Sequence, residues 1–134
     1  TVSNPGSGNK YYIDSVLQPT LTLRRGIIST LDQSSGTTSG HPIRLSTTEN
    51  GTHNGGTEYT GSNNGVVYSG TAGTDGLLSI TLPSDAPDTL YYYCVNHSGM
   101  GGQINVFDSS SIQADLDNRS IALGKYFIDN VIYG

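Results

Sequence analysis

Apolar and polar positions alternate over short runs of this chain, and no long stretch holds the 3.6-residue apolar period of a helix. Runs rich in β-branched and aromatic residues favour strands, and clusters of Gly, Pro, Asn, Asp and Ser between them are typical of turns. Short strands joined by polar turns predict an all-β, antiparallel sandwich or barrel. The predicted strands are Lys10–Leu17, Thr20–Arg25, Ile27–Leu31, His41–Ser46, Gly76–Leu82, Asp88–Cys94 and Gln103–Phe107.

The middle of the chain carries a weaker strand pattern than the rest. Residues 47–75 are rich in Gly, Asn and Thr, which are common in turns and loops. We expect a long surface excursion there, with at most one short strand near Val66–Tyr68.

The two ends of the chain share a short sequence. Residues 10–17 read KYYIDSVL and residues 125–132 read KYFIDNVI, so five of the eight positions are identical. Such a short match arises by chance in some β-rich chains. The alternative is that residues 125–132 are a second copy of the first strand, which opens a further module or pairs with a neighbouring subunit. We therefore divide the chain into an N-terminal arm (1–9), a domain (10–107) and a C-terminal extension (108–134) used for assembly.

Composition narrows the class of protein. The chain has 134 residues, which is the size of one domain, and its net charge is −5. An acidic surface disfavours nucleic acid and anionic membranes as partners. No apolar run approaches the roughly 20 residues that span a bilayer, so we expect no membrane insertion.

A single cysteine excludes an internal disulfide within the chain. Cys94 is therefore a core residue, a reactive thiol or a metal ligand. It ends a Tyr-rich predicted strand, and His97 and Met100 follow at steps of three, beside Gly99 and two further glycines. Glycines permit a loop that folds back so that thiolate, imidazole and thioether face one point.

A fourth ligand has to come from elsewhere in the chain. His41 is the best candidate, because it begins a predicted strand after a turn-rich segment. Two imidazoles and a thiolate in a trigonal plane, with a weak axial methionine, form a type 1 copper site. The predicted ligands are His41, Cys94, His97 and Met100, with one copper ion per chain.

The pattern Cys-x2-His-x2-Met resembles the ligand loop of the blue-copper cupredoxins, and its spacing is similar to that of amicyanin. Plastocyanins have a longer gap between the histidine and the methionine. The resemblance implies a cupredoxin-like Greek-key β-sandwich of seven to eight strands, with His41 as the upstream ligand and an extra strand segment at the C-terminus.

A second resemblance covers residues 8–102. The runs GNKYYID (8–14), LDQSS (31–35), SGHPIRLS (39–46) and YYYCVNHSGMGG (91–102) look like a cupredoxin-like module of marine bacteriophage structural and tail-fibre-like proteins. It implies an assembly role on a virion surface, as a head decoration or tail component, or in an extracellular filament. The alternative is a soluble blue-copper electron-transfer protein.

Pro42 departs from the cupredoxin pattern, in which the residue after this histidine often donates its backbone N–H to the cysteine sulfur. Proline has no N–H, so the thiolate stays more electron-rich, which favours Cu(II).

Other readings of the same residues remain open. Cys94 could serve packing alone, or bind another soft metal such as zinc. We expect His53 to be solvent-exposed and not a ligand. No hydrolytic motif is present, and a saturated four-ligand copper site leaves no open position for substrate, so we expect no enzymatic activity.

Overall fold

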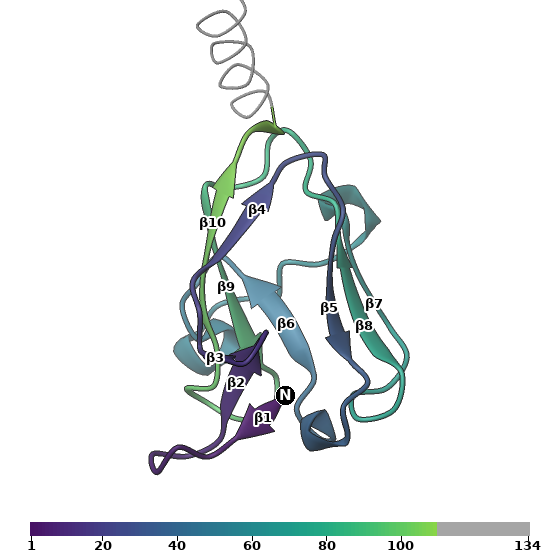
Figure 1. Ribbon diagram of the computed structural model, residues 1–134. Coiled ribbons are helices and arrows are strands. Elements are labelled where there is room, and N and C mark those ends of the chain that lie inside the picture. The colour runs from purple at the N-terminus through teal and green to yellow at the C-terminus, as the bar shows by residue number, and fades with distance from the viewer. Residues whose placement is uncertain (110–134) are drawn as a thin grey trace, which may run out of the picture.

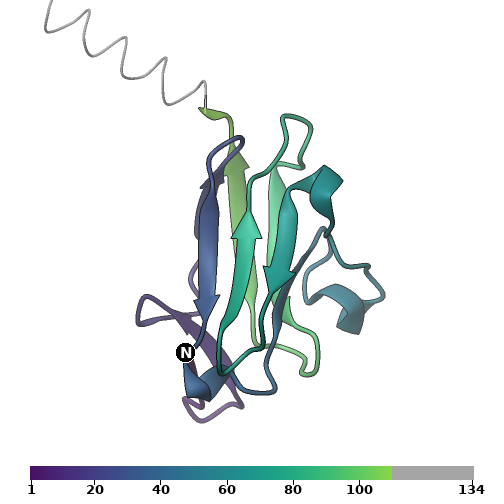
Figure 2. The same ribbon diagram turned by 90° about the vertical axis from the view of Figure 1, so that its right-hand side faces the viewer.

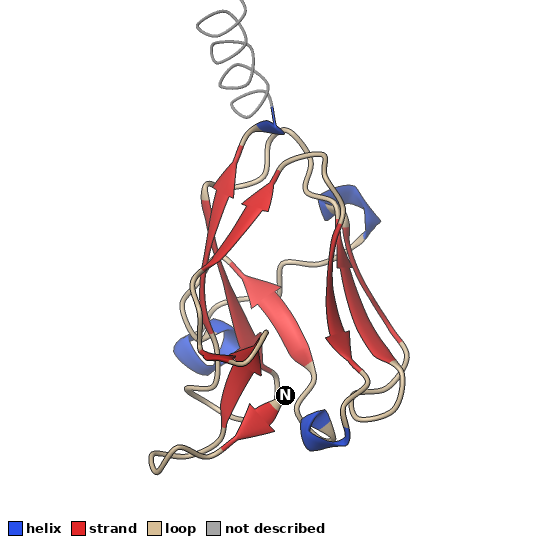
Figure 3. Ribbon diagram, in the orientation of Figure 1, coloured by secondary structure: helices blue, strands red, loops and turns tan. Residues whose placement is uncertain are grey.

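The computed structural model describes residues 1–109, and this part of the chain is all-β. It contains ten strands and three short 3₁₀ helices (Figure 3). The strands are β1 (Val2–Ser3), β2 (Lys10–Ile13), β3 (Val16–Leu17), β4 (Leu21–Arg24), β5 (Ser29–Gln33), β6 (Ile43–Ser46), β7 (Val66–Ser69), β8 (Gly76–Ile80), β9 (Thr89–Cys94) and β10 (Gly102–Phe107). The 3₁₀ helices are η1 (Gly36–Thr38), η2 (Gly51–Asn54) and η3 (Ser62–Asn64). None of the helices described is long and apolar enough to cross a membrane.

The strands form three sheets. A four-stranded sheet has the order β4-β10-β9-β6, in which β4 runs parallel to β10 and the other pairs are antiparallel. An antiparallel three-stranded sheet has the order β5-β8-β7, and β1, β2 and β3 make a small sheet beside the N-terminus. The two larger sheets face one another across the core (Figures 1 and 2).

Alternating burial along the strands explains why the sheets pack in this way. In β8, Gly76, Leu78 and Ile80 are buried while the residues between them are partly exposed. The inward side chains of facing sheets interdigitate to form the core of such a packing. The largest fully buried side chains are Tyr92, Tyr93, Leu45, Leu78, Ile80, Leu82, Leu90, Met100, Ile104 and Val66.

The predicted strand Lys10–Leu17 is wrong as one continuous element. Asp14 and Ser15 have positive φ angles of 51° and 69°, and Ile13 pairs with Val16 across them. Two central residues with positive φ make the tight hairpin turn that matches the twist of antiparallel strands. The segment is therefore the hairpin β2–β3, and the alternation of its side chains concealed the turn.

The other strand boundaries differ by a few residues. The predicted strand Ile27–Leu31 lies at Ser29–Gln33, because Ile27 and Ile28 are exposed in the turn before it. The predicted strand from His41 begins instead at Ile43.

Three further predictions concern the two ends and the middle of the chain. Val2 and Ser3, assigned to the arm, pair with β2. The single strand predicted near Val66–Tyr68 is confirmed as β7. The repeat at residues 125–132 lies outside the described residues.

Candidate metal centre

Strand register brings the first two site residues together. Cys94 is the last residue of β9, and it pairs with Ile43 at the start of β6. His41 lies two residues before Ile43, so the pairing places it beside the cysteine. The Cys94 side chain is fully buried, whereas His41 is half-buried.

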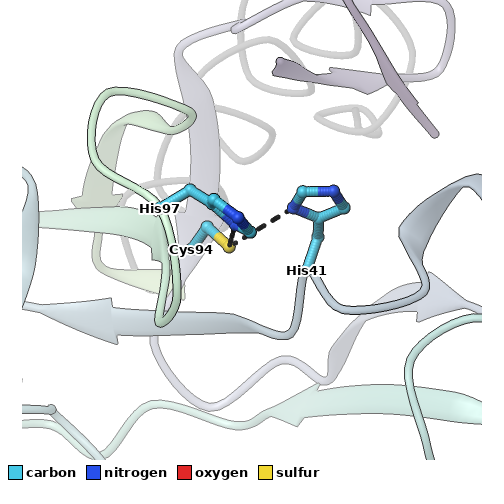
Figure 4. A group of neighbouring side chains, drawn as sticks. All are labelled: His41, Cys94 and His97. Carbon is cyan, nitrogen blue, oxygen red and sulfur yellow. Dashed lines mark hydrogen bonds between the residues drawn. The ribbon is translucent and has the colours of Figure 1, made fainter. Parts of the chain in front are cut away.

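The third residue, His97, comes from the loop between β9 and β10. Its Nδ1 lies 3.6 Å from Cys94 Sγ, and His41 Nδ1 lies 3.7 Å from the same sulfur (Figure 4). The two imidazole centroids are 4.6 Å apart and the rings are tilted by 45°. One ligand atom from each of the three residues lies within 4.8 Å of the other two, so the group could hold a metal ion.

These separations are those of sulfur–nitrogen hydrogen bonds, and they also suit a shared metal ion. Bonds of about 2.0 Å to nitrogen and about 2.3 Å to sulfur, at an angle of about 110–120°, place nitrogen and sulfur about 3.5–3.7 Å apart. The two measured distances lie within or close to that range. Both histidines also present the same ring nitrogen, Nδ1, to the thiol. The donor set of two imidazoles and one sulfur fits a soft or borderline metal ion.

The backbone of His41 is held by buried donors. Its carbonyl accepts a hydrogen bond from the Tyr11 hydroxyl at 2.6 Å and another from Gln33 Nε2 at 2.8 Å. Its N–H donates to the carbonyl of Thr38 at 2.8 Å. These three hydrogen bonds fix the backbone of His41, and the proline at position 42 does not prevent them.

Gln33 is the residue of this site that sequence reasoning missed. It is only 3% exposed, and its Oε1 accepts bonds from the Ile43 N–H at 2.8 Å and the Tyr68 hydroxyl at 2.6 Å. One side chain thus bonds to the backbone on both sides of Pro42. It lies two residues beyond the end of the predicted strand Ile27–Leu31, and its two-residue spacing from Leu31 is the signal that could have marked it as an inward side chain.

The ligand loop is held at Gly99, which lies between His97 and Met100. The Gly99 N–H donates to Asn50 Oδ1 at 2.9 Å, and Asn50 Nδ2 donates to the Ser98 hydroxyl at 2.7 Å. The Gly99 carbonyl accepts from Lys10 Nζ at 2.8 Å and from Gln18 Nε2 at 3.1 Å. These contacts reach the loop from three separate segments of the chain.

The conformation of this loop explains its glycines. Gly99 has a φ of 80°, which L side chains rarely adopt, and a Cβ at Gly101 would collide with the carbonyl of Tyr92. Asn50 and Gln18 themselves have positive φ angles of 63° and 41°. Strained residues of this kind persist where the surrounding contacts hold them.

Two further contacts join the loop to its surroundings. Asn96 Nδ2 donates to the carbonyl of Gly40 at 3.0 Å, which ties the loop to the segment before His41. His53 Nε2 lies 2.7 Å from the Cys94 carbonyl. A carbonyl only accepts, so this nitrogen of His53 carries a proton. His53 is exposed and lies outside the three-residue group, as expected.

Met100 lies at the end of the loop, before β10. It is 1% exposed and belongs to the same buried cluster as Cys94. Its carbonyl accepts from the Tyr11 N–H at 3.0 Å. Its role as an axial ligand stays a prediction.

Burial governs the protonation of the groups around the site. Partial burial, and then the neighbouring His97, lower the pKa of His41 below its ordinary value. A neutral imidazole is the form that binds a metal ion. Burial also raises the pKa of Tyr11 far above 10, so this phenol keeps the proton that it donates to the His41 carbonyl.

Comparisons with known proteins give no match: no family model, no curated protein and no solved structure is similar to this chain. The arrangement of His41, Cys94 and His97 is therefore the main guide to the function of this chain.

Proposed function

We propose that this chain is a cupredoxin-like module that binds one copper ion in a type 1 site through His41, Cys94, His97 and Met100. The observation that carries the proposal is the convergence of the two Nδ1 atoms on Cys94 Sγ at 3.6 and 3.7 Å. The three-residue group could hold a metal ion, and we propose that this ion is copper.

The sheet topology supports the cupredoxin assignment. The cysteine ends β9, the methionine precedes β10, and the upstream histidine precedes β6, which neighbours β9. The chain passes from β4 to β5 in the other sheet and returns to the first sheet at β6, and a hairpin cannot join the parallel pair β4–β10. Such crossing connections are what a Greek key provides.

The choice of copper follows from Met100. It is the only methionine of the chain, it is buried, and it belongs to the same buried cluster as the thiol. Zinc sites rarely use a thioether, whereas a weak thioether in the axial position is typical of type 1 copper. When bound, copper would supply a reversible one-electron centre. The chain's own residues would hold its ligands in one arrangement.

The hydrogen bonds that the Cys94 sulfur accepts affect the reduction potential of such a copper site. In residues 1–109, no backbone N–H donates to Cys94 Sγ, and the Pro42 carbonyl instead accepts the N–H of Val95 at 3.2 Å. Hydrogen bonds to sulfur withdraw electron density, so their absence favours Cu(II) and a lower potential.

For the biological role, we propose a structural module of a virion surface or an extracellular filament, in which copper fastens His41 to the ligand loop. Binding of an ion to the folded state alone stabilises that state. The support is the sequence resemblance to phage structural modules and the repeat at residues 125–132. The proposed partner is a neighbouring subunit, and this role assigns no catalytic step to the copper.

A soluble electron carrier is the second candidate. The observation that favours it is the exposure of His97, which would bring one ligand of the metal to the surface. Electron transfer needs such an exposed edge and a transient partner. Reversible voltammetry with fast self-exchange would favour this role over the structural one.

The test is an optical titration of the purified chain with Cu(II), beside a Cys94→Ser variant as control. We expect an intense visible thiolate-to-copper band at one equivalent, absent from the control, and a rise in Tm on copper binding. Serine keeps the size of the side chain and removes the soft ligand. If the wild-type chain shows no band and no change in Tm, the copper proposal is wrong.

A further inference from the structure

β4 is an edge strand of the four-stranded sheet and β5 an edge strand of the three-stranded one (Figure 1). Residues of both strands line the same groove. The groove has a volume of about 420 Å³. All of β5 and most of β4 line it, together with the segment Tyr11–Asp14 and Thr1.

Both strands bordering this groove lack a partner on their outer edge within residues 1–109. β5 pairs only with β8 and β4 only with β10. No backbone hydrogen bond of Ser29–Asp32 reaches any element besides β8. Unpaired edges are templates for an added strand, and proteins usually cover or charge them.

The side chains in the groove are apolar inside and acidic at the rim. Ile13, Leu21 and Leu31 are only partly buried, although they pack against the core. Asp14 and Asp32 are exposed where they line the groove. A matching strand would offer apolar side chains on one face and a cation near one end.

Residues 125–132 approach that pattern. One face of an extended KYFIDNVI segment carries Tyr126, Ile128 and Ile132 together with Asn130, and its first residue, Lys125, is its only cation. β10 ends at Phe107, at the same end of the molecule as the end of β4 (Figure 1). The residues between 109 and 125 can span up to about 50 Å when extended, so the segment can reach a neighbouring copy.

We propose that residues 125–132 of one copy bind as an added strand in the β4–β5 groove of a second copy. This inference rests on the proposed assembly role, and it names the surface that receives the C-terminal segment. Added main-chain hydrogen bonds would complete the edge of β5, and Ile128 would cover Ile13, Leu21 and Leu31.

The test is residue-resolved hydrogen exchange on the full chain at several protein concentrations, beside Ile128→Asp. We expect those amides of Ser29–Asp32 that do not bond to β8 to exchange about tenfold or more slowly in the wild type at high concentration. Ile128→Asp should abolish this protection and reduce the sedimenting species to the monomer. Ile112→Asp, the same change outside the segment, is the matched control and should behave as the wild type.

Each other outcome overturns a definite part of this proposal. Equal exchange of Ser29–Asp32 in the wild type and in Ile128→Asp refutes the docking site. Protection that does not depend on concentration refutes the exchange between copies and assigns the segment to its own chain. Oligomers that persist in Ile128→Asp refute this site but leave an assembly role standing, and the copper titration is independent of all three.

Discussion

The two histidines of the candidate metal centre are supported in opposite ways. His41 is anchored from the interior: the buried side chains of Gln33 and Tyr11 both donate to its carbonyl. His97 lies on an exposed loop that is held at Gly99 by side chains from the surface, among them Asn50. One half of the site is thus part of the core, and the other is attached to it from outside.

This difference indicates how the site would respond to disturbance. Buried hydrogen bonds are costly to lose, because the groups left behind cannot turn to water. Exposed bonds are replaced by solvent at little cost, so their loss loosens a loop and leaves the fold intact. We therefore expect substitutions on the His41 side to lower the stability of the whole domain. Substitutions on the His97 side should act on the loop alone.

The largest effect is expected from Gln33→Leu. Leucine has a similar volume but leaves the Ile43 N–H and the Tyr68 hydroxyl without their buried acceptor. At about 1–3 kcal/mol for each such group, the free energy of unfolding should fall by roughly 3 kcal/mol. Urea denaturation of the metal-free protein measures it.

The matched control for that prediction is Gln103→Leu, at an exposed glutamine of β10. Its free energy of unfolding should lie within about 0.5 kcal/mol of the wild type. A loss below about 1 kcal/mol in Gln33→Leu would show that His41 is not held by this buried network.

Alkaline pH should lower the stability of the folded domain through buried phenols. Burial raises the pKa of the Tyr11 and Tyr92 phenols well above 10, and both rings are buried. Above pH 10 these groups stay protonated in the folded state and ionise in the unfolded state, so the unfolded state binds fewer protons. Stability is therefore complete below about pH 10 and falls above it, by about 1.4 kcal/mol per pH unit for each phenol.

Urea denaturation at pH 9, 10 and 11 measures this dependence. Tyr11→Phe should reduce the slope by about 1.4 kcal/mol per pH unit, because phenylalanine has no proton to lose, while Tyr92 keeps its share. A slope above pH 10 that Tyr11→Phe leaves unchanged would mean that another group controls the alkaline transition.

The sequence predicted the exposed half of the site better than the buried half. The spacing of Cys94, His97 and Met100 and the glycines around them are local features, so the loop could be predicted from the sequence. Contacts that support the ligands come from residues outside the motif: Gln33 lies eight residues before His41, and Asn50 lies 49 residues before Gly99. No local pattern marks such contacts, because they depend on how the strands pair.

The presence of most strands could be predicted because it depends on local patterns. The residues at which the strands begin and end could not be predicted in this way. Alternation and β-branched residues marked most of the strands, including β8 and β9. The Asp14-Ser15 turn was missed because the apolar pattern continues through it. Ile27 and Ile28 caused the opposite error, because a strand was predicted where the chain forms a turn. Strand-forming residues can lie exposed in a turn when neighbouring residues pair more favourably.

The smallest effect, and the sharpest test of the comparison, is expected at Asn50. Asn50→Gly removes its bonds to the Gly99 N–H and the Ser98 hydroxyl but tolerates the φ of 63°. It should cost at most about 1 kcal/mol, because both bonds are exposed. Asn50→Ala removes the same bonds and adds about 1 kcal/mol or more of left-handed strain. The difference between the two variants separates backbone strain from the loss of the side-chain contact.

The hydrogen-exchange rate of the Gly99 amide tests this prediction directly. Its amide should exchange faster in both Asn50 variants, while the amide of Ile43, bonded to Gln33, should keep its wild-type rate. Copper, if bound, should dissociate faster, because His97 and Met100 flank the released residue. If the Ile43 amide loosened together with Gly99, the two halves would form one cooperative unit. The contrast between a core-anchored and a surface-anchored ligand would then be wrong.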